Sequence, residues 1–313
     1  MRLLLRVRNY IEGLYNRHTA LVSYVVRLVL MFLCLLAMKN ALGFNELLSE
    51  WWFVIAFAVM CAFLKIKYLI IAAGLYACLQ AMSLSIEVGL ALAALLALIY
   101  ILYLRLEPGM GLAMLLIPLS MAVSMPVAIP LVLGTFAAMP AAVTVAVGSV
   151  VYYLLHYLAG AAAVISGYAG SELFTQLNVY VTGIVTYRAL LYNTIILVLV
   201  FLVVYYAKRI NHPRAGDLSV TIGAGVYLVL KLSCEMLFGT ITFARLWMVL
   251  LGTAAGLVIA LVAHNIILPL DFSRVESAEF EDEEYVYYVK AIPKASISRE
   301  EVRITRINSR KKG

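Results

Sequence analysis

The chain has 313 residues, of which 65% are hydrophobic and 13% are charged, and its formal net charge is +7. A water-soluble globular domain carries about 25% charged residues, so this composition excludes a soluble globule and predicts an integral membrane protein. The bases lie at the N-terminus, in short loops and in the tail, which indicates contact with the lipid bilayer and no nucleic-acid partner.

Long apolar runs such as Ile195–Tyr206 predict helical spans, since a membrane barrel would show short alternating segments. At about 20 residues per crossing, residues 19–270 have room for about eight or nine crossings. We therefore expect an all-α, polytopic transmembrane helical bundle in which some spans are short or broken by proline. Residues 271–313 form a separate charged tail that holds more than half of the 17 acidic residues.

Residues 1–18 have the period of an amphipathic helix, with Leu3, Val7 and Ile11 at helical steps and arginines on other faces. A basic helix before the first span is expected to lie in the cytoplasmic interface, and its arginines place the N-terminus inside. Residues 159–188 are interpreted as an interfacial or re-entrant segment. Apolar spans are expected over residues 20–42, 51–64, 68–85, 87–104, 143–158, 191–207, 220–238 and 247–268.

Residues 109–140 contain half of the chain's eight prolines and are too long for one clean helix and too broken for two. Two interpretations are open. Discontinuous helices can expose free carbonyls near the bilayer midplane and build the substrate site of a transporter. The alternative is a kinked, tightly packed helix pair, which small residues permit. The candidate residues of a broken-helix site are Pro118, Pro126, Pro130, Gly134 and Pro140.

The charges near the end of the span over residues 191–207 raise a conflict of parity. Lys208, Arg209 and Arg214 place that end inside, and two further crossings return the C-terminus to the inside. Both termini in the cytosol require an even number of crossings. The eight spans named above and the proline-rich stretch, counted as one crossing, give nine. The proline-rich stretch, as two half-spans or two short tilted helices, is the best candidate to change the parity.

The sharpest candidate site is the pair Lys231 and Glu235, which lie four residues apart inside an apolar run. A charge inside the membrane costs roughly 2.5–3.5 kcal/mol on insertion scales and marks a functional hypothesis. The pair could line an ion or substrate path. It could also neutralise itself and pack structurally, or lie shallow enough for both side chains to reach an interface.

Other polar residues in the apolar body carry weaker signals. His156, with Tyr152, Tyr153 and Tyr157, fits an aromatic interface belt better than a proton relay or a headgroup site. His264 and Asn265 are expected to pack between helices. The cysteines lie singly in apolar runs and are interpreted as small buried hydrophobes, namely Cys34, Cys61, Cys78 and Cys234. The sequence has no catalytic, metal or nucleotide motif, so we expect neither an enzyme nor a cofactor.

The tail alternates apolar and polar residues in two places, which favours strands over residues 285–292 and 302–307. A hairpin between them is the simplest pairing, and a lone hairpin is only marginally stable in water. We therefore expect residues 280–310 to bind a second copy, a cytosolic partner or the inner face of the membrane domain, and the alternative is a disordered, solvated tail. The candidate contact residues are Tyr285, Tyr287, Tyr288, Val302 and Ile304.

Four stretches carry a resemblance to a known group: YLRLEP from Tyr103, MPVAIPLVLG from Met125, VYYLLHY from Val151 and FEDEEYVYYVKAIPK from Phe280. With these the chain, from about residue 87 onward, resembles an uncharacterised family of polytopic membrane proteins from anaerobic Gram-positive bacteria. Members are sometimes labelled permeases. The resemblance implies a bacterial plasma membrane and brings no activity or site residues with it.

Two functions from different classes follow. The first is permease-like transport of a solute or ion, with Lys231, Glu235 and the break at Pro126–Gly134 lining the path. The second is a membrane scaffold or assembly factor that oligomerises or recruits a cytosolic partner through its tail. A wet cavity that reaches Lys231 favours transport, and a dry body with an ordered, oligomerising tail favours scaffolding.

Overall fold

The structure is a computed structural model, and it describes residues 17–105, 107–168, 174–210, 214–239, 242–267, 276–281 and 286–291. The amphipathic helix expected over residues 1–18 lies, except for its last two residues, outside this part of the chain. The contacts divide the chain into a body, residues 17–264, and a second unit made of residues 1–16 and 265–313.

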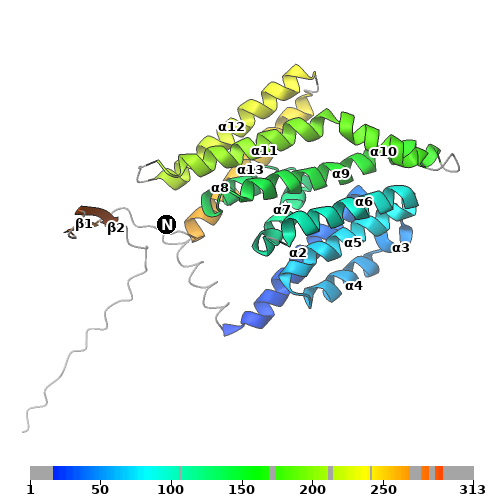
Figure 1. Cartoon of the computed structure of the whole chain (residues 1–313), viewed down its shortest axis with the longest axis horizontal. Coiled ribbons are helices and arrows are strands. Elements are labelled where there is room, and N and C mark those ends of the chain that lie inside the picture. Colours follow the sequence, from blue (N-terminus) through cyan, green and yellow to red (C-terminus); the bar gives the residue numbers. More distant parts are fainter. Residues whose placement is uncertain are drawn as a thin grey trace, which may run out of the picture. The chain divides into compact units, whose positions relative to one another are not determined.

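The first half of the body is a set of apolar helices joined by very short connections (Figure 1). A single residue, Ser85, separates α5 from α6, and α6 continues as a π-helical turn, η1. The elements are α2 (Thr19–Ala41), α3 (Glu46–Ser49), α4 (Trp51–Ala62), α5 (Ile66–Leu84), α6 (Ile86–Ile99), η1 (Tyr100–Leu104) and the short η2 (Pro108–Met110).

The second half contains the proline-rich stretch and the longest helices. Its elements are α7 (Gly111–Ala122), α8 (Ala128–Phe136), α9 (Ala141–Gly167), α10 (Thr175–Thr186), α11 (Arg188–Ala207), α12 (Ala215–Leu237) and α13 (Phe243–Ile267). The expected span over residues 143–158 was too short, because α9 continues to Gly167. Alanine, the best helix former, is the commonest of its added residues, and Gly160 faces open space, so nothing ends the helix there.

Within the described residues, six helical segments are long and apolar enough to cross a bilayer by length and composition. They are Thr19–Ala41, Ile86–Leu104, Ala141–Gly167, Arg188–Ala207, Ala215–Leu237 and Phe243–Ile266. Shorter apolar helices cover Trp51–Ala62, Tyr68–Leu84 and Gly111–Ala122. The all-helical body expected from the sequence is confirmed, and its apolar helices are compatible with an integral membrane protein.

Helix α9 lies between two groups of helices in the body (Figure 1). Its Leu155, Leu158 and Ile165 belong to a core cluster with α5 and α6, whereas its Val145 and Tyr153 belong to a cluster with α8, α11 and α12. A third cluster joins α2, α4 and α5. The body is therefore built as two helix groups that share α9 as a common wall.

Several helix ends meet at one end of the body, which we call the Lys208 end. The Lys208 ammonium donates to the Thr135 carbonyl at the end of α8, and the rings of Phe136 and His264 lie 5.9 Å apart. Tyr103, at the end of η1, contacts Thr144 in the first turn of α9. The ends of α6, α8, α11 and α13 therefore lie together with the start of α9.

The second unit contains a two-stranded antiparallel hairpin of β1 (Glu276–Glu281) and β2 (Val286–Ala291). Its register pairs Glu276 with Ala291 and Glu281 with Val286. Tyr287 and Tyr288 lie in β2, within the strand expected over residues 285–292. β2 pairs with β1, a strand that the sequence analysis did not expect. Residues 302–307 lie outside the described residues, so their pairing stays a prediction. Tyr285, Val302 and Ile304 lie outside the described residues.

Candidate functional site

The proline-rich stretch is broken between Ala122 and Ala128, as the sequence predicts. Ser124 takes the left-handed conformation with φ 62°, and Pro126 lies in the turn, where it cannot donate a helical hydrogen bond. The Met125 amide donates to the Ser120 carbonyl of α7 over 2.8 Å, so one backbone hydrogen-bond donor of the turn is satisfied by the preceding helix. We call residues 123–127 the α7–α8 turn.

The remaining prolines occupy positions that a helix tolerates or that lie away from this turn. Pro130 is in the first turn of α8 and Pro140 precedes the first residue of α9, where a missing amide costs little. Pro118 lies inside α7. The segment around Pro126 therefore causes the break, and the other prolines are compatible with continuous helix.

Two glycines of α13 let the α7–α8 turn approach the helix backbone. A Cβ atom on Gly252 would lie 2.0 Å from the Ser124 carbonyl oxygen, closer than any real contact. A Cβ atom on Gly256 would lie 2.9 Å from Val127 Cγ1 and 3.2 Å from the Ala128 nitrogen. This G-x-x-x-G spacing is common where helices approach closely, and here its partner is a turn.

Lys231 and Glu235 form an ion pair in α12, with Lys231 Nζ 3.1 Å from Glu235 Oε1. Their side chains are only 12% and 5% exposed. The Lys231 ammonium also donates to Asn193 Oδ1 of α11 over 2.6 Å. The side-chain amide of Asn193 in turn donates to the Ala189 carbonyl of the same helix over 2.8 Å. This network joins α11 to α12, and it keeps the lysine charge away from lipid.

The network faces a polar cavity of about 420 Å³ between α7, α9, α11, α12 and α13. Ser124 and Pro126 of the α7–α8 turn line it, together with Lys231 and Glu235. The rest of the polar lining is largely aromatic, and it consists of Tyr152, Tyr153, His156, Tyr187, Tyr192, Asn193, Tyr227 and Arg245. We call this space the polar cavity.

The polar cavity lies toward the end of the body opposite Lys208. It takes residues from the first turns of α11 and α13 and from the last turns of α12. From the α7–α8 turn to the Lys208 end, the packing is apolar and close: Val127 of the turn, Leu131, Val200, Val204 and Val220 are all fully buried. We call these residues the apolar layer.

Glycines tighten the apolar layer around one side chain. Cβ atoms placed on Gly134 and Gly223 would lie 2.7 and 2.3 Å from atoms of Val204. Val204 therefore fits between α8 and α12 only because both facing positions lack a side chain. Gly134, a candidate for the broken-helix site, lies in this layer and does not line the polar cavity.

Comparisons with protein-family models, with curated proteins and with solved structures find no match for the chain. Among the described residues, no group of three or more histidine, cysteine, aspartate or glutamate side chains is placed to hold a metal ion.

The polar cavity unites residues that the sequence had indicated separately. The pair Lys231 and Glu235, the proline break at Pro126, and His156 with Tyr152 and Tyr153 all line it, whereas Tyr157 does not. The aromatic group was interpreted as an interface belt, whereas Tyr152 and Tyr153 line the cavity and His156 stacks on Tyr152 with ring centroids 5.5 Å apart.

Sequence reasoning missed Asn193, Arg245 and Tyr227. Asn193 carried a signal, because it interrupts an otherwise apolar span and is only 6% exposed. Arg245 lies in the first turn of α13, where a basic residue next to a span is ordinarily assigned to topology. His264 packs against Phe136 and over Gly216, in agreement with a role in helix packing.

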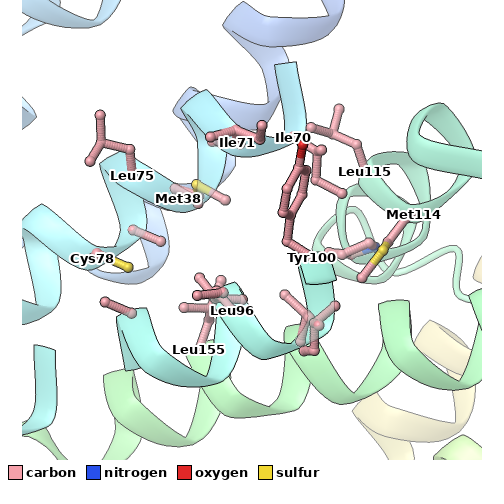
Figure 2. Close-up of a pocket in the computed structure, with 18 of the residues that line it drawn as sticks. Met38, Ile70, Ile71, Leu75, Cys78, Leu96, Tyr100, Met114, Leu115 and Leu155 are labelled. Atoms are coloured by element: carbon pink, nitrogen blue, oxygen red, sulfur yellow. The ribbon is translucent and has the colours of Figure 1, made fainter. Parts of the chain in front are cut away.

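A second cavity, of about 410 Å³, lies between α2, α5, α6, α7 and α9 and is apolar (Figure 2). Met38, Leu75, Leu96 and Leu155 are among its lining residues, and none of the described residues that line it is charged. Pro118 also lines this cavity. Its surface matches hydrocarbon and offers a polar solute almost no hydrogen bonds, so the polar cavity is the better candidate for a solute site.

Proposed function

We propose that the protein is a permease-like transporter whose solute binds in the polar cavity. The observation that carries this proposal is the position of the Lys231–Glu235–Asn193 network and of the α7–α8 turn on the walls of one cavity inside an apolar helical body. Ionisable groups inside a membrane protein mark pathways, and broken helices near the midplane are a common way to build a substrate site.

In this proposal α7 and α8 form a re-entrant hairpin that enters from the Lys208 end and turns back inside the bilayer. Gly111, at the start of α7, lies beside Leu104, and the end of α8 lies beside Lys208. The turn packs on Gly252, well inside α13. The hairpin then makes no crossing, and α2, α4, α5, α6, α9, α11, α12 and α13 cross, an even number that keeps both termini in the cytosol.

Cysteine labelling tests this topology in a background whose four native cysteines are replaced by alanine. A membrane-impermeant maleimide added to intact cells should label Glu46→Cys and Phe174→Cys. Gly109→Cys and Met139→Cys, at the two ends of the re-entrant hairpin, should react only in inside-out vesicles. Labelling of Gly109→Cys and Met139→Cys from opposite sides would show that the hairpin crosses the membrane.

In this conformation of the protein the polar cavity lies on one side of the apolar layer, and the apolar layer is closed. For transport, the apolar layer must open toward the Lys208 end while the opposite end closes, as in alternating access. The movement need not be large, because Val204 is held between two glycine positions and a small shift of α8 would remove that contact.

Accessibility of the apolar layer separates a transporter from a static protein without knowledge of the solute. Ser124→Cys, at the cavity, should react with impermeant reagent added outside. Leu131→Cys, fully buried here, should react slowly from the cytosolic side of inside-out vesicles, because an alternating body exposes it for part of the time. The control Leu35→Cys, equally buried among α2, α4 and α5, should stay unlabelled from both sides. A Leu131→Cys variant that is as inert as the control contradicts transport.

The scaffold function remains the second proposal, and the observation that favours it is the β1–β2 hairpin, since a sheet of two strands is marginal alone and its edges can pair with another chain. Truncation after Phe272 should then lower the oligomeric state of the detergent-solubilised protein. Hydrogen exchange across residues 276–291 of the full chain should be slowed. Complete exchange within seconds, with an unchanged oligomeric state after truncation, removes the support for scaffolding and leaves the transport proposal intact.

A further inference from the structure

The cavity between α2, α5, α6, α7 and α9, which we call the apolar cavity, suits a ligand of a different kind from the polar cavity (Figure 2). Its volume of about 410 Å³ falls in the range of known ligand sites. We propose that it binds the long hydrocarbon chain of a membrane amphiphile, whose polar end lies toward Tyr100. This site is separate from the polar cavity, so the proposal does not depend on transport.

Small residues on two neighbouring helices create the space. Gly74 and Ala77 of α5 line it at a helical step of three residues, and Ala93 and Ala97 of α6 line it at a step of four. A Cβ atom on Gly74 would make an ordinary contact with Leu96, 3.5 Å from Cδ1. A larger side chain at residue 74 would therefore occupy part of the apolar cavity without a clash at its first atom.

The apolar cavity opens toward lipid between α5 and the segment formed by α6 and η1. Leu75 and Tyr100, which line it, are 55% and 38% exposed, whereas Ala77 and Leu115 on its inner wall are buried. The segment Ile86–Leu104 is long and apolar enough to cross a bilayer, so the medium beside it in a membrane is hydrocarbon. A chain can therefore enter from the bilayer without passing through water.

The dimensions of the apolar cavity fit a chain and exclude a helix of a partner protein. Its lining residues on α5 run from Ile70 to Met82, a rise of about 18 Å along the helix. A second helix of that length, about 10 Å across with its side chains, would need roughly three times the volume of the cavity. The same length is a little more than half of a hydrocarbon core about 30 Å thick, which suits a chain from one leaflet.

The π-helical turn η1 gives the apolar cavity one polar end. The Arg105 amide donates to the Tyr100 carbonyl five residues earlier over 2.9 Å, and such turns are frequent at functional sites. The Tyr100 ring extends from η1 in the direction of Ile70 (Figure 2). Its hydroxyl is the only one on a side chain among the described residues that line the cavity. A carboxylate or phosphate ester at this end can accept from that hydroxyl, whereas the rest of the wall offers only apolar contact.

Photo-crosslinking with a diazirine in the middle of the chain tests the site in the full-length protein. The protein is reconstituted into phosphatidylcholine vesicles that contain either a diazirine fatty acid or a phosphatidylcholine with the same diazirine chain. Irradiation should modify Ala77 and Leu115 several-fold more than Val54 and Ala58, which are equally buried but do not line the cavity. The probe with the greater yield identifies a free fatty acid or a phospholipid as the source of the chain. Equal modification of the two buried pairs, or modification of exposed side chains only, overturns the proposal.

Filling the apolar cavity should displace the chain. In Gly74→Leu most of the modification of Leu115 should be lost. The matched control is Gly160→Leu on α9, an exposed position that does not line the cavity and has nothing within 4 Å of an added Cβ, and its yield should equal that of the wild type. Wild-type yields in both variants would mean that the chain lies elsewhere. Should Gly74→Leu fail to fold, an excess of the same amphiphile without the diazirine replaces it: the yield at Leu115 should fall, and an unchanged yield contradicts a binding site.

Discussion

Replacing Gly252 with alanine is expected to destabilise the body strongly, whereas the same replacement at Gly225 should leave it unchanged or slightly more stable. The added Cβ atom at residue 252 would lie 2.0 Å from the Ser124 carbonyl oxygen. That oxygen belongs to backbone held in a left-handed turn, so it cannot rotate away as a flexible side chain would. Overpacking costs about 1–3 kcal/mol where side chains can adjust, and the upper end or more is expected here.

The neighbouring glycines supply a graded control. At Gly256 the closest atoms would be 2.9 Å away and the first is a side-chain methyl group, so the expected loss is smaller. At Gly225, on α12, nothing lies within 4 Å of the added Cβ, and alanine favours helix over glycine by about 1 kcal/mol. Melting temperature and monodisperse yield in detergent should rank the variants 225, 256, 252 from most to least stable. An equal response at 225 and 252 would show that the α7–α8 turn does not rest on α13.

This contact illustrates what the sequence could and could not predict. The spacing of Gly252 and Gly256 is visible in the sequence, and the prolines around residue 126 predict a break. Nothing in the sequence pairs the two, because the lipid-facing and protein-facing sides of a membrane helix are both apolar and periodicity does not separate them. Length and hydropathy therefore located most of the helices, but not the surfaces on which they meet.

The same distinction applies to the candidate site, where one contact could be predicted from the sequence and the others could not. Lys231 and Glu235 could be paired from sequence, because an i,i+4 spacing places both side chains on one face of α12. Asn193 is 38 residues from Lys231, and only the packing of α11 on α12 brings its oxygen within 2.6 Å. Arg245 and Tyr227 enter the same cavity from other helices. Residue patterns in the sequence do not predict contacts between distant segments of similar composition.

The largest functional effect is expected from the Lys231–Glu235 pair, studied as a double-mutant cycle. Lys231→Leu alone removes the ammonium that pairs with Glu235, and Glu235→Leu alone leaves a buried ammonium held by Asn193. Breaking a buried pair by removing one partner costs about 3–5 kcal/mol, so each single variant should melt well below the wild type. The double variant buries no charge at these positions and should recover most of that loss, since an apolar replacement of a whole buried pair is often nearly neutral.

The cycle separates a structural pair from a functional one. Strong non-additivity of the melting data, with a coupling free energy of about 1–3 kcal/mol or more, establishes that the two charges interact in the folded protein. Simple additivity would instead place them apart, in contact with water. If the double variant is stable yet its Leu131→Cys derivative no longer reacts from the cytosolic side, the pair serves the opening of the apolar layer. A double variant that is stable and still labels at Leu131→Cys would make Lys231 and Glu235 a packing device, and the solute path would then have to rely on Arg245 and the α7–α8 turn.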